Sequence, residues 1–303
     1  MPVRDTALDG FRAVAVLCVI AAPAAVFPLG PRVGGGGKIG NEALRLAAPL
    51  GDLGVRLFFV ISGYIITSLL LREEAAQGRF SLRGFYVRRL LRIVPPFAAY
   101  LAIVTLLARF AYILQPLREI PRAALFTCNL QWAECSWFVG HSWTLAVEEQ
   151  FYLLWPLMLL TVTGMARTKL ALAILAALLL AAVFGPGAWQ KNCLSFACIA
   201  LGVIAALRTD WRTRLFSRPR PLLWISAVAL YFAIGRTDQP RVEAVILPIL
   251  SAAILLGGLA LPALQRLLNS PAFQFIGAMS YSLYLWQELF LGAVWMYPRG
   301  AWP

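Results

Sequence analysis

Long apolar runs recur along the whole chain, and they constrain its fold more than any other feature of the sequence. About 20 helical residues are needed to cross a hydrocarbon layer of about 30 Å, and every backbone polar group inside that layer must be paired. Hydrophobic residues make up 60% of the 303 positions and charged residues only 14%, which is too apolar for one soluble core. The sequence therefore predicts an all-α fold, a polytopic transmembrane helix bundle, with residues 1–303 as one integral membrane domain.

The apolar runs between loop signals give nine candidate spans, so we expect about nine to ten crossings. Asp9 and Arg12 lie against or inside the first run, which favours a membrane helix over a signal peptide there. The predicted ranges are 11–29, 53–71, 93–114, 150–166, 170–184, 193–207, 221–235, 242–262 and 273–296.

The chain is strongly basic, with a formal charge of +13 from 27 basic and 14 acidic residues. In a membrane protein the first explanation of such an excess is topology, because basic loops stay in the cytoplasm. Arginine clusters between residues 72 and 92 and between 208 and 220 fall on the same predicted side as the N-terminus. We therefore expect a cytoplasmic N-terminus and membrane lipids as partners, and no nucleic acid.

Ionisable side chains inside or at the edge of a span are costly in a bilayer, so each needs a structural or functional reason. Arg12 has two possible reasons: its side chain snorkels to lipid phosphates, or it takes part in chemistry. The full set is Asp9, Arg12, Arg56, His141, Glu148, Glu149 and Glu288.

The most informative stretch is HSWTLAVEEQFYLLWP, residues 141–156, which begins with the only histidine of the chain. A polar helix entry, with Thr144 as its cap and the acids near the positive helix end, is the structural interpretation. It does not explain why His141 lies next to Glu148 and Glu149, which could orient the imidazole or shift its pKa. A catalytic interpretation therefore stands beside it, with His141 as general base.

A second candidate is FYVRRLLRIVPP, residues 85–96, where Arg88, Arg89 and Arg92 crowd the inner end of the third span. Cytoplasmic retention explains the loop as a whole. Arg89 and Arg92, however, share one helix face and could clamp a phosphorylated ligand through charge-assisted hydrogen bonds. A nucleotide-bearing acyl donor would suit such a clamp.

The five cysteines match no metal-ligand spacing, and no metal is predicted. Cys128 and Cys135 share one predicted loop and could pair if that loop is extracytoplasmic. The sequence leaves that pairing open.

Five blocks in the chain resemble the acyltransferase 3 family of bacterial membrane O-acyltransferases, and they occur in the order found in the family. They are spread over nearly the whole chain. The blocks are LDGFRAVAVL (8–17), GVRLFFVISGYII (54–66), FYVRRLLRIVPP (85–96), HSWTLAVEEQFYLLWP (141–156) and MSYSLYLWQ (279–287).

The resemblance implies a bundle of about ten helices in the bacterial inner membrane. It implies transfer of an acyl group, usually acetyl, from cytoplasmic acyl-CoA to a hydroxyl of an envelope glycan or lipid-linked sugar. The donor nucleotide would lie near Arg89 and Arg92, and Arg12 matches the family's arginine on the first helix.

The chain departs from the family pattern at positions that bear on catalysis. The family's histidine, eleven residues after that arginine, is replaced by Pro23, which has no titratable side chain and cannot act as a base. Gln287 stands near the family's usual later histidine, and we expect that the chain ends before the family's final helix. His141 then becomes the candidate general base, with Glu148 or Glu149 orienting it.

Three functions remain open on this reasoning. The favoured one is an active acyltransferase. The second is a family member that has lost catalysis and keeps a binding or assembly role in envelope glycan synthesis. The third is an unrelated secondary transporter, which would be expected to show inverted repeats that this sequence lacks.

Overall fold

The computed structural model describes residues 6–26, 38–130, 135–216, 218–237, 239–292 and 296, and every element within these ranges is a helix. The predicted all-α class is therefore confirmed for the described chain. The long helices are α1 (Thr6–Val26), α3 (Lys38–Gln77), α4 (Leu82–Arg109), α7 (Ser142–Thr161), α8 (Met165–Phe184), α9 (Gly187–Leu207), α11 (Pro221–Ile234), α12 (Pro240–Gly258) and α14 (Pro271–Phe290). Shorter elements are η2 (Leu117–Glu119), α5 (Ile120–Ala124), α6 (Trp137–Gly140), α10 (Thr209–Phe216) and α13 (Pro262–Leu268).

Six of these helices are long and apolar enough to cross a membrane, namely α1, α3, α4, α8, α9 and α12, and α11 is a shorter apolar helix. The chain is thus a multi-pass membrane protein. Each of the nine predicted ranges overlaps one long helix, but length and composition do not confirm nine to ten crossings. The parts of those ranges at 27–29 and 293–295 lie outside the described residues.

The third span was predicted to begin at residue 93, which is too late. The helix begins at Leu82, where the side chain of Ser81 accepts a hydrogen bond from the Gly84 amide. The arginines between residues 82 and 93 made this segment look like a loop. They are helical, because arginine is a good helix former and a capping serine precedes the segment.

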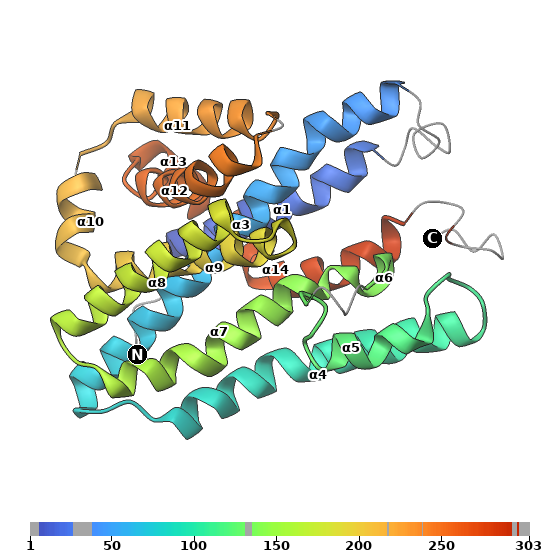
Figure 1. Ribbon diagram of the computed structural model, residues 1–303, viewed down its shortest axis with the longest axis horizontal. Coiled ribbons are helices and arrows are strands. Elements are labelled where there is room, and N and C mark those ends of the chain that lie inside the picture. The colour runs from blue at the N-terminus through green and yellow to red at the C-terminus, as the bar shows by residue number, and fades with distance from the viewer. Residues whose placement is uncertain are drawn as a thin grey trace.

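Long helices alternate in direction, so the bundle has two ends (Figure 1). We call one the arginine end: α3 and α9 finish there, and α4 begins there. The other is the histidine end, where α6 and the start of α7 lie. In Figure 1, α4 and α11 lie along opposite edges of the bundle.

Glycines bring the central helices α3 and α9 into direct backbone contact. A Cβ atom added at Gly63 would collide with the carbonyl of Ile199, and one added at Gly202 would collide with the carbonyl of Val60. Small residues at a crossing allow such close approach in membrane bundles. This pair of helices therefore forms a rigid centre.

Peripheral helices instead carry large apolar side chains on the outside. On α4, Leu91 and Leu106 are exposed, and on α8, Leu180 and Phe184 are exposed. In water such a surface would be unfavourable, whereas in a bilayer it faces lipid.

Cys128 and Cys135 are joined by a disulfide at the histidine end, with their Cα atoms 5.7 Å apart. The pairing that the sequence left open is therefore present. The bond ties the segment after α5 to the residues that precede α6.

Candidate functional site

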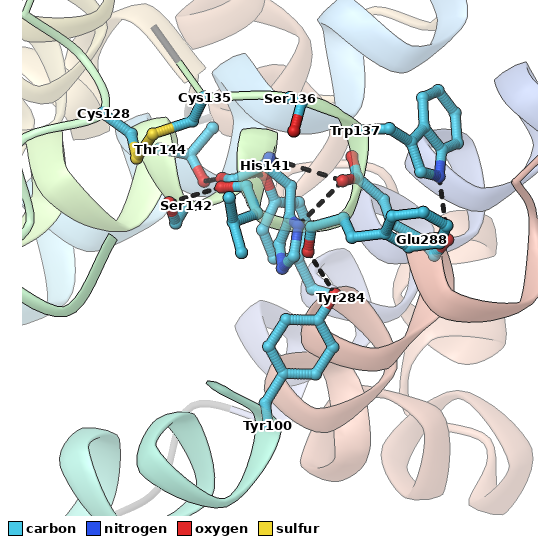
Figure 2. Close-up of polar contacts among 12 residues, drawn as sticks. Tyr100, Cys128, Cys135, Ser136, Trp137, His141, Ser142, Thr144, Tyr284 and Glu288 are labelled. Carbon is cyan, nitrogen blue, oxygen red and sulfur yellow. Dashed lines mark hydrogen bonds and ion pairs between the residues drawn. A yellow bond between two sulfur atoms is a disulfide. The ribbon is translucent and has the colours of Figure 1, made fainter. Parts of the chain in front are cut away.

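His141 lies between α6 and α7, and its imidazole is held by a carboxylate from α14. The Nδ1 atom is 2.9 Å from Oε2 of Glu288, and only 2% of the His141 side chain is exposed. Figure 2 shows Glu288 reaching the imidazole from α14. Within the described part of the chain, Nε2 is buried and has no hydrogen-bond partner. A carboxylate on Nδ1 favours the tautomer that leaves Nε2 free to accept a proton.

Aromatic rings enclose this imidazole. The ring of Tyr100 from α4 lies 5.3 Å from it edge-on, and the ring of Tyr284 from α14 lies 5.7 Å away. The Tyr284 hydroxyl is 2.7 Å from Oγ1 of Thr144 and donates to the His141 carbonyl at 3.2 Å. Trp137 donates its indole N–H to the Glu288 carbonyl at 2.8 Å, which anchors α14 beside α6. The His141–Glu288 pair is thus fixed by contacts from three helices.

Glu148 and Glu149 were expected to orient His141, and the structure gives that contact to Glu288 instead. His141 and Glu148 are separated by about two helical turns, or about 10 Å along the axis, so their side chains do not meet. Glu148 accepts hydrogen bonds from the Ser62 hydroxyl at 2.5 Å and the Tyr152 hydroxyl at 3.1 Å. The sequence marked Glu288 only as a costly charge, because 147 residues separate it from His141.

Glu148 lines a cavity inside the bundle, together with Arg12 from α1 and Ser62 from α3. The cavity has a volume of about 50 Å³ and is partly open to solvent. Thr144 and Tyr284 also line it, and the Tyr284 ring packs against the imidazole of His141. The cavity and the surroundings of His141 therefore share a wall. His141 itself is not among the lining residues.

Arg12 points into this cavity, and only 22% of its side chain is exposed. Its guanidinium is 3.8 Å from the carboxylate of Asp9, one helical turn away. The buried Nε atom has no hydrogen-bond partner among the described residues. Of the two interpretations of Arg12, the position favours a role inside the bundle over snorkelling to lipid phosphates.

The arginines of α4 divide between two environments. Arg89 lies over the ring of Tyr152, 5.0 Å from its centre, and within electrostatic reach of Glu148. Arg92 interacts electrostatically with both Arg12 and Arg89. These three arginines therefore concentrate positive charge beside the cavity, an arrangement that favours an anionic ligand.

Arg88 does not belong to this group of arginines. Its Nη2 atom lies 3.1 Å from Oε2 of Glu73 at the arginine end, and 64% of its side chain is exposed. The predicted set of Arg88, Arg89 and Arg92 is therefore not brought together as one cluster. One step along a helix turns a side chain by about 100°, which points Arg88 away from the face that carries Arg89.

Glu149 adds a second carboxylate to the cavity region. It interacts electrostatically with Glu148, Arg89 and Tyr281. Together with the arginines it forms a mixed-charge cluster across α1, α4, α7 and α14.

The two positions that depart from the family pattern are both described. Pro23 lies inside the last turns of α1, at the histidine end. Gln287 on α14 is buried, and its Oε1 atom has no hydrogen-bond partner in the described residues. Neither side chain can exchange a proton as a histidine does.

Across the described ranges, no group of three or more His, Cys, Asp or Glu side chains is placed to hold a metal ion. The polar groups of the cavity are hydroxyls, guanidinium groups and a carboxylate. Such groups bind and orient an organic substrate through hydrogen bonds and charge.

Comparison with known proteins decides the family. The model of the acyltransferase 3 family, described as an acyltransferase domain, matches residues 5–302. The chain belongs to the acyltransferase 3 family. The suspected resemblance is confirmed, and the match extends across nearly the whole chain.

Curated relatives of this family member come from several bacteria. One from Staphylococcus aureus has the provisional name O-acetyltransferase; it is 28% identical over 96% of this chain and 51% of its own length. One from Bacillus subtilis, provisionally named a peptidoglycan O-acetyltransferase, is 28% identical over 92% of this chain and 47% of its own. The peptidoglycan O-acetyltransferase of Listeria monocytogenes is 32% identical over 58% of this chain and 28% of its own. This chain spans about half the length of the first two relatives. No solved structure matches it significantly.

Proposed function

We propose that this protein is a membrane O-acyltransferase of the bacterial inner membrane. It moves an acyl group, in the simplest case acetyl, from cytoplasmic acyl-CoA to a hydroxyl of an envelope carbohydrate or lipid-linked glycan. The observation that carries the proposal is the cavity that Arg12 and Glu148 line, bordered by the arginines of α4 on one side and by the surroundings of His141 on the other.

Donor binding is assigned to the α4 arginines. Arg89 and Arg92 lie near Arg12, and a phosphate-bearing donor would offset the mutual repulsion of these three cations. Arg88, held by Glu73, would contribute less. The donor therefore enters from the arginine end, which the distribution of basic residues places in the cytoplasm.

Proton transfer is assigned to His141, with Glu288 as its positioning residue. The acceptor hydroxyl oxygen attacks the thioester carbonyl carbon, and its proton passes to Nε2 of His141. When the carbon–sulfur bond breaks, the thiolate leaves and takes up the proton, so that an ester and free coenzyme A thiol are formed. Because Nε2 is buried, the side chains around it must shift for a hydroxyl to reach it.

The carboxylates of α7 have a different task in this scheme. Glu148 is held by Ser62 and Tyr152 and balances the charge of Arg12 and Arg89 while the cavity is empty. Glu149 extends this balance towards Arg89. Both keep the arginines in place for the donor.

Pro23 favours a second candidate, a family member that binds acyl-CoA without transferring its acyl group. The deciding experiment uses the full chain in proteoliposomes with radiolabelled acetyl-CoA and an envelope glycan fraction. The proposal predicts release of free coenzyme A thiol and label in alkali-labile esters of the glycan. Binding of acetyl-CoA with no release of thiol would overturn it and select the second candidate.

A further inference from the structure

A second pocket opens at the histidine end, between the starts of α7, α9 and α12 and the first half of α3. Its volume is about 310 Å³. Its charged lining comes from Asp52, Arg56, Lys191 and Glu243, and its aromatic lining comes from Phe59 and Trp143. The assignment of His141, the α7 carboxylates and the α4 arginines leaves this pocket unused.

We propose that this pocket binds the acyl acceptor, and that it takes a hydroxyl-bearing molecule with an anionic group, a carboxylate or a phosphate. The inference rests on the proposed function, which it extends from a hydroxyl acceptor to a charged one.

The anionic group is assigned to Arg56. Its Nε atom donates to Oδ2 of Asp52 at 2.6 Å, and the Tyr231 hydroxyl donates to the same oxygen at 2.8 Å. The Nη1 atom is buried and has no hydrogen-bond partner in the part of the chain that the structure describes. Only 10% of the Arg56 side chain is exposed, so this donor is largely removed from water. An anionic oxygen in the pocket would satisfy it.

Lys191 provides a second cation at the mouth of the pocket. Its Nζ atom lies 3.6 Å from the centre of the Trp143 ring, and the residue is exposed. Lys191 also interacts electrostatically with Glu288, the partner of the His141 imidazole. A ligand bound between Lys191 and Arg56 would therefore lie at the same end of the bundle as the proposed general base.

Hydroxyl groups of the ligand have acceptors in the same pocket. Asp52 and Glu243 line it with carboxylate oxygens, and Gln190 lines it with an amide. Aromatic rings beside such groups suit the apolar faces of a sugar, as in many pockets that combine apolar walls with a few polar groups.

The pocket and the central cavity share a wall. Val55 and Phe59 line both spaces, and the Phe59 ring packs edge-on against Trp143 with their centres 6.0 Å apart. An acceptor entering from the histidine end would thus be separated from the Arg12 cavity by these two side chains. Donor and acceptor would approach one another from opposite ends of the bundle.

The test measures binding to the full chain in lipid nanodiscs, without acyl donor, by saturation-transfer NMR with three probes. Glucuronate carries a carboxylate, glucose 1-phosphate carries a phosphate, and glucose carries neither. We expect half-saturation at concentrations at least about tenfold lower for one or both anionic sugars than for glucose, since hydrogen bonds to charged groups are the stronger ones. Which anionic sugar binds better identifies the group.

Two variants locate the effect. Arg56→Gln and Lys191→Gln should each remove most of the preference for the anionic sugar, whereas Arg236→Gln, an exposed arginine at the same end outside the pocket, should leave it intact. Because Arg56 is buried with Asp52, thermal unfolding is used to check that Arg56→Gln is folded. If Arg56→Gln is not folded, the test rests on Lys191→Gln, since Lys191 is exposed.

Equal half-saturation for all three sugars, or a preference that survives in both folded variants, would overturn the inference. Since no acyl donor is present, this result is independent of whether the protein transfers acyl groups. Conversely, acyl transfer to uncharged glycans with no anionic preference would keep the proposed function and remove only this assignment.

Discussion

The polar groups of this membrane bundle occupy two regions that are built in opposite ways. At the histidine end, the imidazole of His141 is enclosed by aromatic rings and paired with one carboxylate. In the middle of the bundle, Arg12 and Glu148 line an open cavity and are surrounded by further charges. A sealed pair with one spare nitrogen suits proton transfer, and an open cluster with excess positive charge suits an anionic substrate. This difference is the reason why the proposed function assigns the two regions to different steps.

The largest expected effect comes from the sealed region, with Glu288→Gln. Loss of the carboxylate on Nδ1 should lower turnover by about 10² to 10⁴, the range expected when an acid–base residue is removed or held in the wrong tautomer. The apparent affinity for acetyl-CoA should stay unchanged, because Glu288 is at the opposite end from the α4 arginines.

Glu288→Asp is the matched variant for this change. It keeps the charge and should recover part of the lost turnover, with a pH profile closer to the parent protein than that of Glu288→Gln. If Glu288→Gln retained more than about a tenth of the parent turnover, the assigned proton transfer would be wrong.

The next effect comes from the open region and compares two neighbours on α4. Arg89→Gln should raise the KM for acetyl-CoA about tenfold or more, because one charge-assisted contact to the donor is lost. Arg88→Gln should change it far less, since Arg88 is already engaged by Glu73. Steady-state kinetics of both variants in proteoliposomes provides the comparison. Equal effects of the two variants would show that the arginines act only through overall charge.

A smaller effect is expected at Pro23, where the family pattern has histidine. If His141 is the general base, Pro23→His should bring no gain in turnover. Parallel assays of the parent protein and the variant test this directly. Activity that appears only in Pro23→His would show that the natural chain lacks a general base. The assignment of proton transfer to His141 would then be wrong.

The smallest effect is expected outside both regions, at the ion pair between α9 and α10. Arg208 donates from Nε at 2.8 Å and from Nη2 at 2.6 Å to Asp210, which lowers the pKa of that carboxyl to about 2. With the pKa lowered, the stabilisation is present above the ordinary value and is lost as the pH falls towards about 2.

Asp210→Asn should therefore lower the unfolding midpoint only slightly at pH 7, since exposed pairs are screened by water and salt. The difference from the parent protein should narrow as the pH falls below 4, and turnover should not change. A marked loss of turnover would extend the functional region to α10.

Much of the fold was predictable from sequence, because apolar runs and helix length are local properties. The nine ranges each overlap a helix, and the largest errors fell where polar residues continue a helix beyond its apolar part, as at Leu82. Arg92 interacts electrostatically with Arg12 and Arg89, and the role of the α4 arginines as a donor clamp stays a prediction.

The partner of His141 was beyond sequence reasoning. Local spacing suggested Glu148 or Glu149, whereas packing of α14 against α6 and α7 brings Glu288 to Nδ1. Which helices become neighbours depends on shape, including the glycine contacts between α3 and α9, and a single sequence does not encode it in any local pattern. For the same reason the sequence did not predict the Arg56 pocket, which four helices form. It marked only Arg56, as a charge that is costly inside a span.

The most direct test of the account is His141→Ala in proteoliposomes with radiolabelled acetyl-CoA and an envelope glycan fraction. Binding of acetyl-CoA and transfer of label are measured on the same preparation. The account predicts that binding is retained while transfer falls by at least about 10². Unchanged transfer in His141→Ala would contradict it, since no other imidazole is present in the chain.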